Sequence, residues 1–214
     1  MKRILTMLIL YLSVISVLHA QSCPDSNHPH AIDLGIGVKF ACCNVGASSP
    51  EQYGCHYAWG ETEEKEVYDE NSYPGRGDQR YKNRKYVAFG TDISGTRYDV
   101  AYVKWGLDWR MPTKEQLYML RDRCKKEWIT YKHVEGCRFI GPNGHSIFLP
   151  ASGFRWYEDT NYVGYSGGYW SSTLSAQGSN GTSDAYFLFF DSGRIEMSHR
   201  DRAGGSSVRP VKEQ

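Results

Sequence analysis

Residues 185–198 read AYFLFFDSGRIEMS, and this stretch predicts a β-hairpin near the end of the chain. Its first half is a dense aromatic run, which is typical of a strand packed against a core. Residues 191–193 (Asp-Ser-Gly) follow, and these residue types favour a tight turn. The returning strand alternates polar and apolar side chains, with Ile195 and Met197 on the apolar side. The hairpin should therefore have one buried and one accessible face.

Four other segments carry clear local signals. Residues 36–43 alternate large apolar and smaller or polar side chains, which predicts an early strand. Thr113 and Gln116 have the spacing of a capping box and predict a helix that starts at Thr113. Residues 141–149 place a Gly-Pro-Asn-Gly turn before a short apolar strand, and residues 206–211 read as a last strand. With 16 tyrosines, 6 tryptophans and 22 glycines, the chain favours an α+β fold of short antiparallel strands, flanking helices and long ordered loops.

The first residues predict export from a bacterial cell. Residues 1–20 combine a positive start, an apolar run and a small residue at the end, which is the pattern of a signal peptide. We therefore expect residues 21–32 to be an N-terminal leader and residues 33–214 to form one domain, secreted, periplasmic or on the outer cell surface. An uncleaved signal anchor is one alternative. A lipid anchor on Cys23 is another, although the lipobox-like residues 20–23 lack leucine at the first position.

The charge balance argues against nucleic acid as a partner. The net charge is +1, and removing Lys2 and Arg3 with the signal peptide leaves −1. Nucleic-acid-binding domains present a basic surface, which this balance does not provide. A membrane is expected as a partner only through a lipid on Cys23.

Six cysteines follow the signal peptide, and an even number in an oxidising compartment favours disulfides. Six cysteines allow 15 pairings, and the sequence does not choose among them. Their spacing does not match a zinc site, so we expect neither a metal nor another cofactor. The disulfide candidates are Cys23, Cys42, Cys43, Cys55, Cys124 and Cys137.

No pattern in the chain predicts catalysis. Residues 164–168 spell the G-x-S-x-G nucleophile motif around Ser166, but neither the preceding strand nor the following helix of that motif is indicated. The histidines are scattered, and no phosphate-binding loop is present. A hydrolase that uses Ser166 is therefore the least favoured hypothesis.

The polar side of the predicted hairpin is the candidate ligand-binding face. Arginine and aromatic residues are enriched at binding hot spots, although the same residues could simply form a half-buried, solvated strand face. The candidate residues are Tyr186, Phe187, Phe189, Arg194, Glu196, Ser198, Arg200 and Arg202.

Several motifs along the mature chain occur together in one known family. They include residues 33–47, 57–62 (Tyr-Ala-Trp-Gly-Glu-Thr), 109–113 (Trp-Arg-Met-Pro-Thr), 141–151, 168–173 (Gly-Tyr-Trp-Ser-Ser-Thr) and 207–211 (Ser-Val-Arg-Pro-Val). With them the chain resembles the Fibrobacter succinogenes major paralogous domain, which is common in secreted proteins of gut Bacteroidota. The resemblance implies a C-type-lectin-like fold, in which the N- and C-terminal strands pair and a second small sheet carries the ligand face.

The resemblance does not imply a particular ligand. The calcium-dependent sugar motifs of true lectins are absent, and residues 141–143 (Gly-Pro-Asn) lack the carboxylate those motifs need. Formylglycine-generating enzymes share the fold, but they need a cysteine pair near the C-terminus, whereas the last cysteine here is Cys137. Retroelement-diversified binding proteins are also similar, and residues 186–205 occupy the place of their ligand face.

These observations favour a secreted or cell-surface ligand-binding module rather than an enzyme. Its partner would be an extracellular protein or a glycan. The alternative is a structural subunit of a surface or fimbrial assembly.

Overall fold

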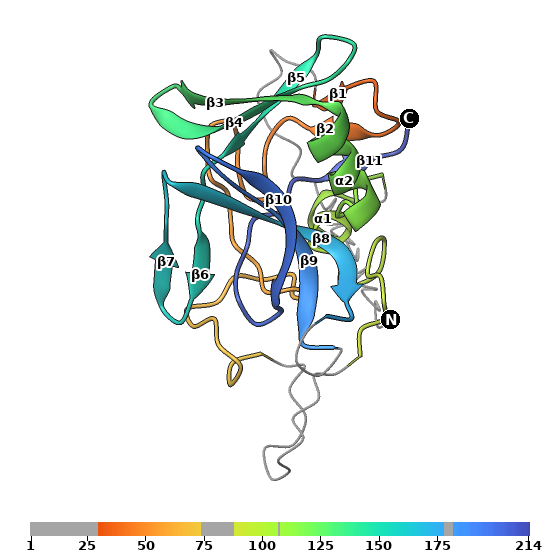
Figure 1. The fold of residues 1–214 in the computed structure, drawn as a ribbon. Helices are drawn as coiled ribbons and strands as arrows, with labels where there is room; N and C mark the ends of the chain where they lie inside the picture. The colour runs from red at the N-terminus through yellow and green to blue at the C-terminus, as the bar shows by residue number, and fades with distance from the viewer. Residues whose placement is uncertain (1–29, 74–87, 107, 178–181) are drawn as a thin grey trace, which may run out of the picture.

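The computed structural model describes residues 30–73, 88–106, 108–177 and 182–214. These residues form eleven strands and two helices, and all four sheets are antiparallel. The architecture is therefore mainly antiparallel β with two helices (Figure 1). The predicted signal peptide, residues 1–20, lies outside the described residues. No described helix is long and apolar enough to cross a bilayer.

The first sheet joins the two ends of the described chain. It contains β1 (Ala31–Asp33), β2 (Lys39–Ala41) and β11 (Val211–Lys212), with β2 in the centre. Val211 lies opposite Phe40 in an antiparallel register, so the predicted pairing of the early and last strands is confirmed. Strand β1 starts at Ala31, two residues before the predicted domain boundary at residue 33, and that boundary stays a prediction.

The central sheet contains the predicted hairpin. Its strands are β8 (Ser166–Ser175), β9 (Asp184–Asp191) and β10 (Ile195–Asp201), in the order β10-β9-β8. Ile195 lies opposite Phe190, which places the turn at the predicted Asp-Ser-Gly.

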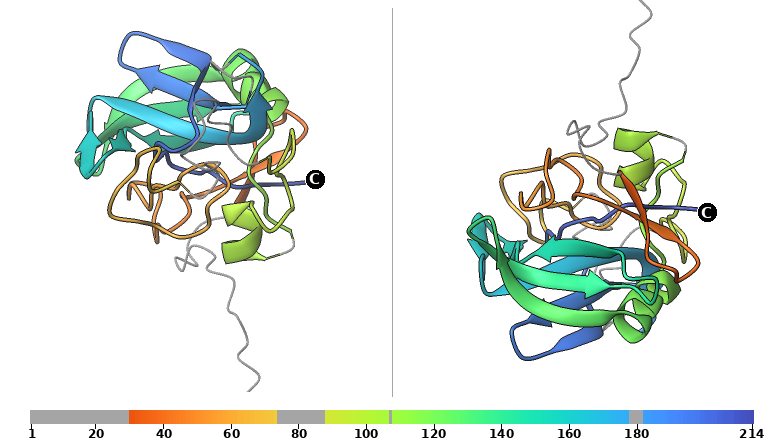
Figure 2. Two further views of the ribbon diagram at one scale, coloured as in Figure 1. Left: turned by 90° about the horizontal axis from the view of Figure 1, so that it is seen from below. Right: turned by 90° about the horizontal axis from the view of Figure 1, so that it is seen from above.

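Two smaller sheets complete the fold. One contains β3 (Lys125–Tyr131), β4 (Val134–Ile140) and β5 (Ser146–Pro150), and the other is a hairpin of β6 (Phe154–Trp156) and β7 (Asp159–Asn161). In both views of Figure 2 the central sheet and the β3–β4–β5 sheet lie on one side of the molecule. The loops before residue 73 and the first helix lie on the other side.

Both helices have side-chain caps at their N-termini. The first, α1 (Val100–Trp105), is capped by Asp99, whose carboxylate accepts from the backbone of Ala101 and Tyr102. The second, α2 (Lys114–Arg123), has the predicted capping box of Thr113 and Gln116. Helix α2 contacts β8, β9 and β10, so local signals and packing agree on its position.

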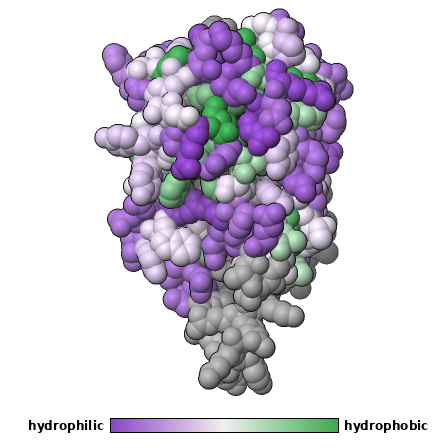
Figure 3. Space-filling model, viewed as in Figure 1, coloured by the Kyte–Doolittle hydropathy of each residue, from purple (hydrophilic) through white to green (hydrophobic). Residues whose placement is uncertain are grey.

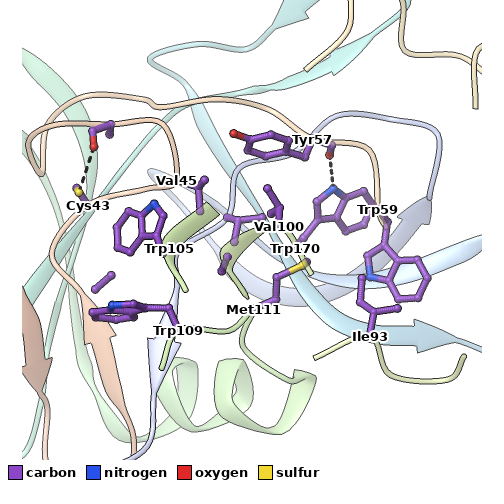
Figure 4. Close-up of a cluster of buried hydrophobic side chains, with 14 of the residues drawn as sticks. Cys43, Val45, Tyr57, Trp59, Ile93, Val100, Trp105, Trp109, Met111 and Trp170 are labelled. Atoms are coloured by element: carbon purple, nitrogen blue, oxygen red, sulfur yellow. Dashed lines mark hydrogen bonds between the residues drawn. The ribbon is translucent and has the colours of Figure 1, made fainter. Parts of the chain in front are cut away.

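The central sheet lies between two hydrophobic clusters. Trp170 and Phe187 point into the first, whereas Tyr169, Leu188 and Phe190 point into the second. Figure 4 shows the first cluster, in which the Trp170 Nε1 donates to the Tyr57 carbonyl over 2.7 Å. Both faces of β8 and β9 are thus covered, and the accessible part of this sheet is β10 with the turn that precedes it.

The five described cysteines are not bonded to one another. Cys124 and Cys137 lie in the second cluster, and Cys42 and Cys43 lie in the first, with Cys55 packed against it. The sixth candidate, Cys23, lies outside the described residues.

A buried arginine joins three parts of the chain beside the terminal sheet. Arg209 is 1% exposed, and its guanidinium donates to the carbonyls of Ala41, Cys42 and Phe148 and to the Asn44 side chain. These acceptors belong to the end of β2, to the loop after it and to β5, while Arg209 itself leads into β11. One side chain therefore fixes segments that share few sheet hydrogen bonds.

Replacing Arg209 with Met should lower the free energy of unfolding by about 3–5 kcal/mol, because the buried carbonyl groups would lose their donors. Urea unfolding followed by tryptophan fluorescence measures this loss. Lys212→Met, at the partly exposed end of β11, is the control and should change stability by no more than about 1 kcal/mol. Equal effects of the two substitutions would contradict the role given to Arg209.

Candidate ligand-binding face

The register of β9 and β10 decides which candidate side chains share a face. Glu196 lies opposite Phe189 and Ser198 lies opposite Phe187, so these four residues belong to one face of the ribbon. Tyr186 lies opposite His199 on the other face, where Lys114 of α2 sits 4.9 Å from its ring. The prediction that Tyr186 joins Phe187 and Phe189 in one surface is therefore wrong.

Aromatic rings and arginines form a continuous row along the first face. The Arg194 guanidinium lies 4.7 Å from the Phe189 ring, and Phe189 makes an edge contact with Phe187 at 6.4 Å. The Arg200 guanidinium follows, 5.9 Å from Phe187.

The row continues onto β6, where the same guanidinium is 4.6 Å from Phe154, and the Phe154 ring packs 5.3 Å from Tyr162. We call this set the aromatic–arginine row: Tyr162, Phe154, Arg200, Phe187, Phe189 and Arg194. It connects the predicted hairpin with the loop after β7, which the sequence did not single out.

The turn end of the row is accessible. Arg194 and Glu196 have side chains that are 60% and 47% exposed. They lie 3.5 Å apart, and Arg194 also pairs with Asp191 at 3.2 Å. Ser198 and Phe189 are half-buried beside them. The charges at this end are thus largely balanced.

Two candidate residues belong to the interior instead. Phe187 is 7% exposed and packs against Trp170 in the first cluster. Arg202 is fully buried, where it donates to the Tyr73 hydroxyl and the Thr182 carbonyl and stacks on Trp59. The alternation along β10 was predicted correctly, but loops cover this end of the strand. Arg202 therefore cannot meet a ligand.

Arg200 has a positioning role at the middle of the row. It donates to the Ser206 hydroxyl over 3.1 Å and to the Arg155 carbonyl over 3.4 Å. Burial among aromatic rings lowers the pKa of its guanidinium to about 10, which leaves it charged at neutral pH. Its contacts hold β6 against β10.

The most exposed aromatic side chains lie on and after the β6–β7 hairpin. Tyr157, Tyr162 and Tyr165 are 52%, 62% and 76% exposed. The sequence does carry a signal for them, because residues 154–165 contain five aromatic residues in a polar context. In the view of Figure 3 the surface is mostly hydrophilic with small hydrophobic patches, so tyrosine rings, rather than broad aliphatic patches, provide apolar contact area.

Two of these tyrosines have an unfavourable backbone conformation. Tyr157 has φ 55° and Tyr162 has φ 60°, in the left-handed region that glycine and asparagine adopt more easily. Such residues cost free energy and concentrate at functional sites. Each ring packs on one aromatic neighbour, Tyr157 on Trp156 and Tyr162 on Phe154, yet both tyrosines remain more than half exposed.

The hairpin that carries the tyrosines is firmly held. Arg155 donates to the carbonyls of Lys65, Glu66 and Glu158 at 2.8–3.1 Å and stacks on the Tyr68 ring. Backbone hydrogen bonds join Tyr157 to Tyr68 in both directions. The exposed rings are therefore presented by a rigid element, which reduces the entropy lost on binding.

The polar groups near this face do not form a serine–histidine–carboxylate triad. Ser166 is 5% exposed, and its hydroxyl has no hydrogen-bond partner in the described structure. His199 binds Asp184 at 2.7 Å, but the nearby Ser183 hydroxyl donates to Asp184 and not to the imidazole. A serine nucleophile needs the opposite order, with histidine between serine and carboxylate.

Among the described residues, no group of three or more His, Cys, Asp and Glu could hold a metal ion.

Phe187→Ala should lower the free energy of unfolding by about 3–5 kcal/mol because it removes a buried ring. Arg194→Ala should change it by less than about 0.5 kcal/mol, since the side chain is exposed. Urea unfolding gives the free energy of unfolding of each single variant, and the difference between them shows that Phe187 is a core residue and Arg194 a surface residue. A similar loss for both would contradict the burial described above.

His56 supports the start of β6 and should make stability depend on pH. Its Nε2 lies 3.0 Å from the Ser152 carbonyl, and burial lowers the pKa of the imidazole below the usual 6.5. The unfolded chain therefore takes up the proton first, and the free energy of unfolding should fall as pH decreases from about 6.5 toward the pKa of the folded state.

His56→Gln retains a donor for Ser152 and does not titrate, so its free energy of unfolding should change less between pH 7.5 and 5.5. Urea unfolding at both pH values provides the comparison. The same change in wild type and variant would exclude His56 as the cause.

Comparison with protein-family models, with curated proteins and with solved structures finds no match to this chain. The resemblance to the major paralogous domain accordingly stays an expectation from sequence.

Proposed function

We propose that this protein is an exported ligand-binding module. Its recognition face would be formed by the accessible residues of the aromatic–arginine row (Tyr162, Phe189 and Arg194) together with Tyr157 and Tyr165. One observation carries the proposal: Tyr157 and Tyr162 hold bulky rings in solvent at backbone positions that disfavour them. A side chain that burial does not reward and the backbone opposes is best explained by a contact with another molecule.

The chemistry of this face suits non-covalent recognition. Tyrosine gives a large, rigid contact area and a hydroxyl for hydrogen bonding, with few rotatable bonds to immobilise. Arg194 and Glu196, at the exposed end of the row, add polar contacts at the rim, where charge contributes more to specificity than to affinity. Binding would need no covalent step and no cofactor.

The partner class stays an extracellular protein or a glycan. The balanced charges around Arg194 offer no basic patch for nucleic acid, in agreement with the net charge of the chain. Paired terminal strands and long loops, with the ligand face in the C-terminal half, support a C-type-lectin-like assignment as part of the same proposal.

Replacing Tyr157 and Tyr162 together with Asn should abolish ligand capture without destabilising the fold. Asparagine tolerates the left-handed conformation, so the free energy of unfolding should stay unchanged or rise by up to about 1 kcal/mol. Capture is measured by probing glycan and extracellular-protein arrays with labelled protein that comprises residues 21–214.

The matched control is Tyr131→Thr, which removes a 38% exposed tyrosine from β3, outside the proposed face. This variant should keep the array signal of the wild type. A double variant that binds like wild type, or that loses more than about 1 kcal/mol of stability, would contradict the proposal. Wild-type protein that elutes as large homo-oligomers and binds nothing on the arrays would favour the structural-subunit hypothesis.

A further inference from the structure

A surface hollow lies between the turn of the β9–β10 hairpin and the strand β3. Its volume is about 320 Å³, at the lower end of the roughly 300–1,000 Å³ that is typical of small-molecule sites. Lys126 and Trp128 line it from β3, Ile195 lines it from β10, and the turn residues 191–193 close it. Two sheets that are distant in the sequence therefore build this hollow together.

Trp128 provides the apolar wall of the hollow. Its side chain is half-buried, and its ring makes an edge contact with Phe190 of the second hydrophobic cluster, with 6.4 Å between the ring centres. The core thus fixes the indole on one side, while the same residue lines the hollow. A sugar ring has an apolar C–H face and hydroxyl groups around its rim, and the C–H face packs well on the electron-rich face of an aromatic ring.

The turn provides a rigid polar wall. The Asp191 carboxylate accepts from the backbone N–H groups of Gly193 and Arg194 over 2.8 and 2.9 Å, which holds the turn in one shape. The Arg194 guanidinium lies 3.2 Å from the same carboxylate and balances its charge. Ser192 is exposed between them, so its hydroxyl is accessible to a ligand.

Lys126 gives the hollow a positive charge that is not balanced locally. Its ammonium donates to the Arg121 carbonyl, and in the described part of the chain it forms no ion pair with a carboxylate. The neighbouring Lys125 differs, because it lies on the opposite face of β3 and pairs with Glu127 at 2.8 Å. A ligand with an anionic group would complement the charge of Lys126.

We propose that this hollow binds an anionic sugar residue. The sugar ring packs on Trp128, its carboxylate or sulfate pairs with Lys126, and its hydroxyl groups meet the turn at Ser192. This inference rests on the proposed function, because it names the ligand class of the same module.

The hollow adjoins the proposed recognition face. Ser166 lies opposite Asp191 in the β8–β9 register, so the exposed Tyr165 comes directly before the partner of the turn. Arg194 borders the hollow and also belongs to the aromatic–arginine row. A glycan with one residue in the hollow can therefore continue across the turn onto the recognition face.

The test is a calorimetric titration of the exported, purified protein with three anionic probes: sialyllactose, sulfated lactose and tetragalacturonate. Lactose and the methyl ester of tetragalacturonate are the neutral counterparts. At least one anionic probe should bind with a Kd below about 1 mM, and its neutral counterpart should bind at least about tenfold more weakly. The three anionic probes distinguish carboxylated from sulfated sugars as the source of the charge.

Two variants of neighbouring lysines test the site itself. Lys126→Gln should weaken binding of the anionic probe about tenfold, because it removes the unbalanced charge. Lys125→Gln removes a charge from the same strand on its opposite face and should bind like wild type. Trp128→Ala should abolish binding, and its melting temperature shows whether it remains folded. If it does not, Trp128→Phe, which keeps an aromatic wall, should retain binding.

The site is overturned if no anionic probe binds, if the neutral counterparts bind equally well, or if the two lysine variants behave alike. Array binding that is lost in the Tyr157 and Tyr162 double variant but unchanged in Lys126→Gln would uphold the proposed function and overturn this site. Wild-type protein that binds nothing on the arrays or in the titrations would overturn both.

Discussion

The fold depends on one buried positive charge. Arg209 leads into β11, a strand of only two residues, and this short pairing provides few hydrogen bonds to hold the C-terminus. The guanidinium supplies the missing donors by binding carbonyls of Ala41, Cys42 and Phe148. It thereby fixes the buried segment 203–210, whose backbone forms bridges to Tyr57 and Tyr169. The central sheet pairs with that segment through the Tyr169–Ser207 bridge, so the position of the proposed recognition face depends on this constraint.

The same chemistry explains why the predicted face includes Arg202, which lies in the interior. A protein with long ordered loops has many carbonyl groups that no sheet satisfies, and a planar guanidinium with five donors can serve several of them. Arg155 binds three carbonyls and Arg202 binds the Thr182 carbonyl, and each also lies over aromatic rings. Arginine on the polar side of a strand therefore need not face solvent here. Among the three candidate arginines, Arg194, Arg200 and Arg202, the side chain of Arg194 is the one that is mostly exposed.

What the sequence could predict was local. The capping box of α2 and the turn of the β9–β10 hairpin each depend on a few neighbouring residues, and both lie where they were expected. The β3–β4 pair was missed because residues 125–131 mix charged and aromatic side chains without a clean alternation. The exposed tyrosines were missed because no sequence pattern indicates that the backbone of Tyr157 and Tyr162 adopts positive φ. Likewise, Phe187 and Arg202 are buried by residues that are far from them in the sequence, such as Trp170 for Phe187 and Tyr73 for Arg202.

The molecule separates the residues that hold the face from the residues that present it. Arg155 and Arg200 fix the β6–β7 hairpin through carbonyls and ring faces, and neither is strongly exposed. Tyr157, Tyr165 and Arg194 extend into solvent and contribute little to the core. Substitutions at the presenting positions should therefore alter recognition while leaving the supporting contacts intact, because more than half of each presenting side chain is exposed. Rigid support beneath exposed side chains is the property that the proposed binding module needs. It follows here from the carbonyl groups to which Arg155 and Arg200 donate.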